Sequence, residues 1–402
     1  MSEETSPLEA APTTPGPGSR TRLAVDEAFL REAGGPAQPS GSEPEQQIKL
    51  SELLQVVIDR GASDLHLTAG VPPVIRLHGH LVKLDDYPRL GTTSIRQMIY
   101  SILTQRQRER FEENLELDLS YSLPGRARFR VNVYLQRDAV GAALRLIPVQ
   151  IKSLQELGLP PQMEQFAQFP RGLVLLTGPT GSGKSTTLAA LIDIINSERQ
   201  VHIMTVEDPI EFLHQHKKSV VNQREVGTDT MSFANALRHA LRQDPDVILV
   251  GELRDLETIS IALTAAETGH LVFATLHTQD APQSVDRMID VFSPHQQQQV
   301  RVQLASSLQA IATQQLLPTK EGMSRAVVTE ILTATPAIRN LIRESKTHQI
   351  YSAMQAGGRY GMQTMDQSLA DLVRRGKLSF EVALERCHNQ EDFRQLAGRA
   401  QA

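Results

Sequence analysis

Apolar residues recur with two different spacings along the first third of the chain. LSELLQVVIDRGA, which follows Ile48 and Lys49, carries them at helical spacing, and Gly61 ends that segment. SDLHLTAG and VPPVIRLHGHLVKL then alternate between apolar and polar residues, with a turn expected at His78-Gly79. After a helical segment near 94–114, LELDLSYSL, ARFRVNVYLQ and GAALRLIP have strand character. Residues 47–150 are therefore predicted to form a small α+β domain with an antiparallel sheet.

The middle of the chain has a different pattern, in which short apolar runs are separated by helical segments. Leu173–Leu176 form one such run, and VHIMTVEDP, DVILVGE and HLVFATLHT provide three more. Strands that alternate with helices indicate a mostly parallel sheet covered by helices on its faces. Residues 151–318 are predicted to form this α/β domain. Residues 319–402 begin with one strand, AVVTEIL, and continue as helical segments.

Composition changes this picture at four points. Residues 1–46 are rich in Pro, Gly, Ser, Ala and Glu, which predicts a disordered tail with a short helix at 21–34. The net charge of −5 argues against bulk nucleic-acid binding. The single cysteine, Cys387, rules out an internal disulfide and an all-cysteine zinc site, which fits a reducing cytoplasm. No apolar run of about 18 residues is present, so no membrane-spanning segment is expected.

The stretch LVLLTGPTGSGKSTTL, from Leu173 to Leu188, reads as a buried strand, a glycine-rich turn and the start of a helix. It fits the phosphate-loop pattern G-x-x-x-x-G-K-[ST]. Glycines let several backbone N–H groups point at one anion, and the helix dipole adds positive potential. Lys184 is expected to reach the β- and γ-phosphates of ATP, and Ser185 to ligate Mg²⁺. The predicted nucleotide-binding residues are Gly178, Pro179, Thr180, Gly181, Ser182, Gly183, Lys184, Ser185 and Thr186.

Carboxylates follow two of the later apolar strands. Glu207 and Asp208 end VHIMTVEDP, and Glu252 follows DVILVG. Ligands of open parallel sheets bind beyond the carboxyl ends of the strands, so both glutamates are candidates for Mg²⁺ or for the attacking water. Gly251 stands where a Walker-B strand commonly has an aspartate. The sequence leaves open whether Glu252 orients the water, deprotonates it or holds the metal through water.

Two histidines bracket the strand in TGHLVFATLHT. His277 ends the strand and is predicted to sense the γ-phosphate, whereas His270 is a candidate nucleotide contact or a hydrogen-bonded residue without chemistry. Arg130 and Arg145 lie on strand-like runs of the small domain. They are either surface residues or arginines that neutralise γ-phosphate charge in a neighbouring subunit.

The phosphate loop, TVEDPIEF, the strand ending in Gly251-Glu252 and GHLVFATLHT, in this order, resemble the secretion and type IV pilus ATPase superfamily. Within it, AIRNLIRE (337–344) and GMQTMDQSL (361–369) are similar to the pilus retraction ATPases of the PilT family. The resemblance covers the chain from about Ile48 onward. It implies a PAS-like N-terminal domain, a RecA-like P-loop domain with a helical C-terminal region, and a ring of six chains. Arg130 and Arg145 match family positions that act across the subunit interface.

That resemblance also implies a function: a cytoplasmic motor ATPase that drives pilus retraction. It would act on a platform protein of the inner membrane, and a paralogous motor ATPase is a further possible partner. One alternative is an assembly or secretion motor, against which AIRNLIRE and the missing four-cysteine module argue. A second is a slow-turnover ATP-binding regulator, against which the four intact boxes argue. A DNA translocase would need a basic excess that this chain lacks.

Overall fold

The computed structural model describes residues 48–77, 79–123, 126–147, 150–322 and 324–398. The predicted tail, the predicted helix at 21–34 and His78 of the predicted turn lie outside the described residues. Residues 48–402 group together as one unit by their contacts. Within the described part, no helix is long and apolar enough to cross a membrane.

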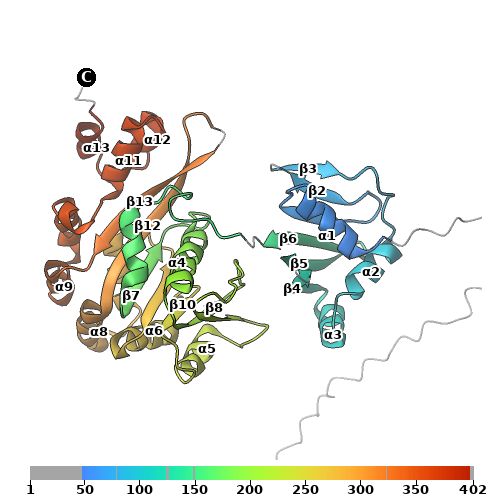
Figure 1. Cartoon of the computed structure of the whole chain (residues 1–402), viewed down its shortest axis with the longest axis horizontal. Helices are drawn as coiled ribbons and strands as arrows, with labels where there is room; N and C mark the ends of the chain where they lie inside the picture. The colour runs from blue at the N-terminus through green and yellow to red at the C-terminus, as the bar shows by residue number, and fades with distance from the viewer. Residues whose placement is uncertain (1–47, 78, 124–125, 148–149, 323, 399–402) are drawn as a thin grey trace, which may run out of the picture. The chain divides into compact units, whose positions relative to one another are not determined.

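Six antiparallel strands among the described residues form the first sheet, in the order β3-β2-β1-β6-β5-β4 (Figure 1). The predicted antiparallel sheet is therefore confirmed. The strands are β1 (Asp64–Leu67), β2 (Val74–Leu77), β3 (His80–Lys83), β4 (Glu116–Leu123), β5 (Ala127–Gln136) and β6 (Ala139–Ile147).

Helices cover one face of this sheet. They are α1 (Leu50–Asp59), α2 (Thr92–Tyr100) and α3 (Gln105–Asn114). Apolar residues of α1 and α2 share a core with Leu65, Phe129 and Leu144 of the strands. The helical segment predicted near 94–114 is in fact two helices, because Thr104 starts a new one: its side chain accepts a hydrogen bond from the Gln107 amide, and Gln107 bonds back to the Thr104 amide.

Seven strands in the described part of the chain form the second sheet, in the order β13-β12-β7-β11-β10-β8-β9. All neighbouring pairs are parallel except the β12–β13 pair, so the mostly parallel sheet is confirmed. Strands β9 and β12 were not predicted, because their polar residues interrupt the apolar runs. The strands are β7 (Gly172–Thr177), β8 (His202–Glu207), β9 (Val220–Glu225), β10 (Val247–Val250), β11 (Leu271–Leu276), β12 (Leu308–Pro318) and β13 (Arg325–Thr333).

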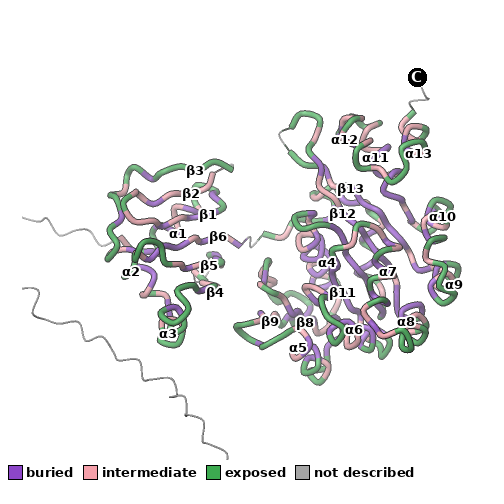
Figure 2. Tube along the Cα trace, turned by 180° about the vertical axis from the view of Figure 1, so that it is seen from behind, coloured by how far each residue is buried: buried purple, intermediate pink, exposed green. Residues whose placement is uncertain are grey.

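Helices pack on both faces of the second sheet, and its central strand β11 is buried along its whole length (Figure 2). One face is covered by the 3₁₀ helix η2 (Pro161–Gln168) and by α4 (Lys184–Glu198). The other face is covered by α5 (Phe233–Ala240), α6 (Leu256–Thr268), α7 (Ala281–Asp290), α8 (Pro294–Ser307) and α9 (Pro336–Arg343).

The last helices form a smaller core of their own. Leu369 and Phe393 pack there with Leu317 of β12 and Val328 of β13. The elements after α9 are η3 (Thr347–Gln349), α10 (Ile350–Gln355), η4 (Gly358–Tyr360), α11 (Met365–Arg374), α12 (Phe380–Leu384) and α13 (Gln390–Leu396).

The register of the second sheet decides where the candidate residues meet. Thr177 at the end of β7 is paired with Leu276 at the end of β11, and Val250 at the end of β10 is paired with Ala274 and with Val206. Since all four strands are parallel, the loops that follow them lie at one edge of the sheet. The phosphate loop, Glu207, Glu252 and His277 all belong to these loops or strand ends.

Candidate nucleotide-binding and hydrolysis site

The phosphate loop follows β7 and leads into α4, as predicted. Gly178 has a φ of 134°, and a Cβ there would lie 2.2 Å from the backbone oxygen of Gln314. Only glycine fits this close approach. Ser185 and Thr186 lie in the first turn of α4, while Pro179, Thr180 and Gly181 are exposed at the tip of the loop.

Lys184 is buried at the start of α4. Its Nζ donates hydrogen bonds to the carbonyl oxygens of Gly178 and Pro179, at 2.7 and 3.0 Å. Burial lowers the pKa of Lys184, while the negative charges of Glu252 and Glu211 act in the opposite direction. The negative charge of Glu252 therefore acts on Lys184, and the pairing of β10 with β11 and of β11 with β7 puts both residues at the same edge of the sheet.

A cleft of about 630 Å³ opens beside the phosphate loop. Two buried oxygen atoms in its lining, Ser182 Oγ and Gln314 Oε1, have no hydrogen-bond partner among the described residues. The amide nitrogen of Gln314 donates a hydrogen bond to Thr187 Oγ1 at 3.0 Å, whereas the amide oxygen of Gln314 accepts none from the described residues. Buried polar atoms are normally hydrogen-bonded, so the lining is suited to a polar ligand such as the nucleotide. The residues that line it include Lys152, Ser182, Gly183, Thr186, Thr187, Gln314, Leu316 and Val327.

Glu252, directly after β10, is held by two cationic or ionisable side chains. Its Oε2 lies 2.8 Å from Arg254 Nη2, and its Oε1 lies 3.2 Å from His277 Nε2. Burial raises the pKa of this carboxyl, but Arg254 and His277 outweigh it, and the pKa is lowered overall. Glu252 is therefore ionised at neutral pH and has its two oxygens oriented at the edge of the sheet.

Gly251 occupies the expected aspartate position for a steric reason. A Cβ at this residue would lie 3.2 Å from the Val206 oxygen and 3.3 Å from the Glu207 Cα, closer than side chains normally approach backbone. The Gly251 carbonyl also accepts a hydrogen bond from Thr275 Oγ1. The close contact with β8 disfavours aspartate here, which leaves Glu252 as the acid of this strand.

Glu207 ends β8 in a more enclosed environment than Glu252. Its oxygens accept hydrogen bonds from Thr205 Oγ1 at 2.6 Å, from Gln223 Nε2 at 3.1 Å and from the Glu211 amide at 3.4 Å. Burial raises the pKa of Glu207, and these hydrogen bonds only partly oppose it. The contacts tie Glu207 to the loop that follows β8.

The two histidines lie at opposite ends of β11. His277 follows its carboxyl end and contacts Glu252. His270 precedes its amino end, beside the Leu271–Gly172 pair, and its Nδ1 contacts the carbonyl of Ala265 at 2.9 Å. Six strand residues span roughly 20 Å, so the structure does not bring His270 to the other predicted residues. Its contacts instead stabilise the end of α6.

Arg130 and Arg145 are direct cross-strand partners on β5 and β6. The Arg145 side chain is 71% exposed and forms an ion pair with Asp64. Arg130 is exposed and has no ion pair among the described residues, unlike Arg128, whose Nη2 lies 3.1 Å from Glu225 Oε2. Arg130 is thus exposed without an ion pair among the described residues, and Arg145 is exposed beside its partner Asp64.

Sequence reasoning missed three residues that organise this site. Arg254 orients Glu252, Gln314 lines the cleft, and Gln223 on β9 donates to Glu207. Arg254 could have been found from the sequence, because it lies only two residues after Glu252 in GELRD. The other two come from strands that the apolar pattern did not reveal.

The AIRNLIRE segment forms α9 and the residue after it. Ile338 and Ile342 are buried, and Arg339 Nη1 donates to the carbonyls of Ala305 and Ser306 near the end of α8. Asn340 and Arg343 are exposed. The segment therefore combines an anchoring face with a polar surface.

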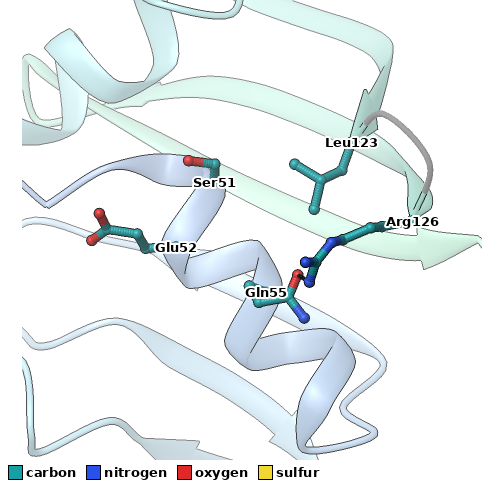
Figure 3. Close-up of a pocket in the computed structure, with 5 residues that line it drawn as sticks. All are labelled: Ser51, Glu52, Gln55, Leu123 and Arg126. Atoms are coloured by element: carbon teal, nitrogen blue, oxygen red, sulfur yellow. Dashed lines mark hydrogen bonds between the residues drawn. The ribbon is translucent and has the colours of Figure 1, made fainter.

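A second hollow, of about 290 Å³, lies on the first sheet between α1 and the facing ends of β4 and β5 (Figure 3). It is lined by Ser51, Glu52, Gln55, Leu123 and Arg126. Arg126 points toward Gln55 and donates a hydrogen bond to it. This hollow has no feature of a phosphate site beyond that bonded arginine.

Comparison with known proteins identifies the family of this chain. Residues 42–395 match the family model described as "Type II/IV secretion system protein". The chain is 52% identical to the type IV pilus retraction ATPase PilT of Pseudomonas aeruginosa, over 86% of this chain and 99% of that protein. It is 53% identical to the twitching motility protein of Neisseria gonorrhoeae, over 80% of this chain and 86% of that protein.

Among solved structures, the crystal structure of the pilus retraction motor PilT with bound ADP matches with a TM-score of 0.81 at 49% identity. That match covers 86% of this chain and 98% of the other. The chain therefore belongs to the type II/IV secretion system protein family and, within it, to the PilT family of type IV pilus retraction ATPases.

Proposed function

We propose that this chain hydrolyses ATP at the edge of its second sheet and uses the energy to drive retraction of a type IV pilus. The observation that carries the proposal is the arrangement at that edge: an ionised Glu252, held by Arg254 and His277, acts on the same site as Lys184. A P-loop ATPase combines a phosphate-binding loop with a residue that positions the attacking water. The likeness to pilus retraction ATPases supplies the process that hydrolysis serves.

Each group has a distinct part in the proposed reaction. The backbone N–H groups of the phosphate loop and Lys184 bind the β- and γ-phosphates. Glu252 orients the attacking water and accepts its proton, because its lowered pKa keeps it ionised. His277, bonded to Glu252, links the γ-phosphate position to that carboxylate. Glu207 holds the loop after β8 through the Glu211 amide, and it is the second candidate for the general base.

Magnesium fits the oxygen donors of this site. Mg²⁺ prefers hard oxygen ligands and is usually held by one or two protein groups together with substrate phosphates. Within the described residues, no group of three or more His, Cys, Asp or Glu side chains is arranged to hold a metal by itself. The Ser185 hydroxyl at the start of α4 would bind the ion. Glu252 and Glu207 are the carboxylates that would complete its coordination, directly or through water. When bound, the ion would neutralise charge on the phosphates.

We further propose the architecture and assembly of the working motor. Residues 47–150 are a PAS-like domain, 151–318 a RecA-like domain and 319–402 a C-terminal region. Six chains form a ring in which Arg130 and Arg145 reach the ATP of a neighbouring subunit. The ring works in the cytoplasm against a platform protein of the inner membrane, and paralogous motor ATPases are candidate partners.

A deletion strain tests the proposed process. Loss of a retraction motor leaves excess surface pili and abolishes twitching, whereas loss of an assembly motor leaves no pili. Complementation with the wild-type chain should restore twitching, and complementation with a Lys184→Ala chain should not. A bald deletion strain would identify an assembly motor and overturn the proposal.

A further inference from the structure

Four charged side chains form a row across the first sheet. Arg130 on β5 pairs with Arg145 on β6, Arg145 pairs with Asp64 on β1, and Asp64 pairs with Arg76 on β2. Directly opposed residues of antiparallel strands point to the same face of a sheet. The row therefore lies on one face, opposite the face on which α1 and α2 pack.

Asp64 is the only acid of this row. Its side chain is 8% exposed, its Oδ1 accepts a hydrogen bond from Arg145 Nε at 2.8 Å, and its Oδ2 accepts one from Ser63 Oγ at 2.7 Å. Arg76 Nε lies 3.6 Å from Oδ2 on the other side. Burial raises the pKa of Asp64, but the Ser63 and Arg145 hydrogen bonds and charges lower it overall. The carboxylate is therefore charged, and each of its two oxygens has a partner.

This contact leaves part of Arg145 available. The hydrogen bond to Asp64 uses Nε, and neither terminal nitrogen of Arg145 donates a hydrogen bond within the described part of the chain. A guanidinium presents its donors in a planar fork that matches two oxygens of a phosphate. With Nε held, the fork of this exposed side chain is directed rather than free to sample many rotamers.

The row also carries an electrostatic cost. Like charges directly opposite each other destabilise an antiparallel pair, and Arg130 faces Arg145 in this way. Three arginines and one aspartate leave the row with a net positive charge. An anion placed over Arg130 and Arg145 would remove that repulsion, which makes the face suited to a polyphosphate.

We propose that Asp64 is a positioning residue for ATP hydrolysis, which holds Arg145 by Nε so that its terminal nitrogens meet the γ-phosphate of a neighbouring copy of this chain. The inference rests on the proposed function, in which Arg145 acts across the subunit interface. Arg76 forms an ion pair with the same carboxylate from the opposite side and does not itself contact the phosphate.

The test replaces Asp64 by asparagine, which keeps the size of the side chain and removes its charge. In assembled rings, Asp64→Asn should lower kcat about tenfold, because asparagine can still accept a hydrogen bond from Arg145 Nε through Oδ1 but that bond loses the charge that makes it strong. Affinity for ADP, which has no γ-phosphate, should not change. The midpoint of thermal unfolding should fall, because the buried Asp64 carboxylate is stabilised by Arg145 and Ser63, so kcat is compared at a temperature below the unfolding transition of both proteins. Asp118→Asn is the matched control, because Asp118 is exposed on β4 of the same sheet and lies outside the row.

A double-mutant cycle separates positioning from a general structural role. If Asp64 acts through Arg145, Asp64→Asn should cause no further loss in an Arg145→Gln background. Losses that multiply would overturn the proposal. If Asp64→Asn does not fold, Asp64→Glu keeps the charge but moves the carboxylate by one methylene. It should lower kcat with thermal stability retained, and wild-type kcat in that variant would overturn the proposal.

The outcomes also distinguish this inference from the function on which it rests. If Arg145→Gln lowers turnover but Asp64→Asn does not, the positioning role is wrong and the trans arginine stands. If Arg145→Gln turns over at the wild-type rate, the proposed role of Arg145 is wrong, and the positioning role is overturned with it.

Discussion

Replacing Glu252 by glutamine is the most direct perturbation of the proposed chemistry. The carboxylate receives a hydrogen bond or ion pair on each oxygen, from Arg254 at 2.8 Å and from His277 at 3.2 Å. Glutamine keeps one oxygen acceptor and nearly the same shape. It loses the negative charge and the ability to accept a proton, so it removes the chemistry with little change in packing.

The expected magnitude follows from these contacts. Loss of a positioned general base lowers kcat by roughly 10²-fold or more, which corresponds to about 2.7 kcal/mol in activation free energy. Nucleotide binding should be retained, because Lys184 keeps its contacts with Gly178 and Pro179 and the phosphate loop is unchanged. The loss should therefore be in kcat rather than in the affinity for ADP.

Phosphate release at saturating Mg-ATP, together with titration of fluorescent ADP, measures both quantities on rings verified by size-exclusion chromatography. Glu257→Gln is the matched control. Glu257 lies five residues further along in α6, is exposed, and forms an ion pair with Arg238 away from the phosphate loop. A kcat within a few-fold of wild type for Glu252→Gln would refute its role as base and make Glu207 the better candidate.

Three further predictions follow from other parts of the structure. Lys184→Ala should abolish hydrolysis and weaken ADP binding, because the phosphates lose their mobile cation; wild-type turnover would show that this loop is not the active site. An excess of Glu252→Ala/Arg130→Ala chains should lower activity per wild-type chain more steeply than an excess of Glu252→Ala chains alone. Equal activity in verified mixed rings would exclude action of Arg130 in trans. Burial raises the pKa of Glu330 to about 7, so its proton stabilises the fold fully below about pH 4.5, and that contribution of about 3 kcal/mol is lost as the pH rises through 7. Glu330→Gln should remove this fall in urea-unfolding free energy between pH 5.5 and 7.5, and an unchanged fall would contradict the assignment.

The helices and strands that were predicted correctly are those that a local pattern of apolar residues specifies. The period of Leu50, Leu53, Leu54 and Val57 predicted α1, and all four are buried on its inner face. The apolar runs of β7, β8, β10 and β11 were recognised because strands buried on both faces have little polar interruption. Strands β9 and β12 were missed for the opposite reason, since Asn222, Gln314 and Gln315 interrupt their patterns.

The site shows the same division. Lys184, Glu252 and His277 were predicted because each follows a recognisable apolar strand or turn. His270 was included because it lies beside the same strand in sequence, but the direction of β11 places it at the other end. The contacts that orient Glu252 depend on β10 and β11 being neighbours, and no local pattern specifies that order.

By itself, then, the sequence determined the phosphate loop, the two kinds of sheet and the family, because glycine spacing, apolar period and motif order are local properties. Only the tertiary structure decided the role of Gly251, the hold of Arg254 and His277 on Glu252, and the row that joins Asp64 to Arg145. These depend on strand order and register, which bring residues distant in the sequence within hydrogen-bond reach. Asp64 and Arg145 are 81 positions apart, and only the pairing of β1 with β6 makes them partners.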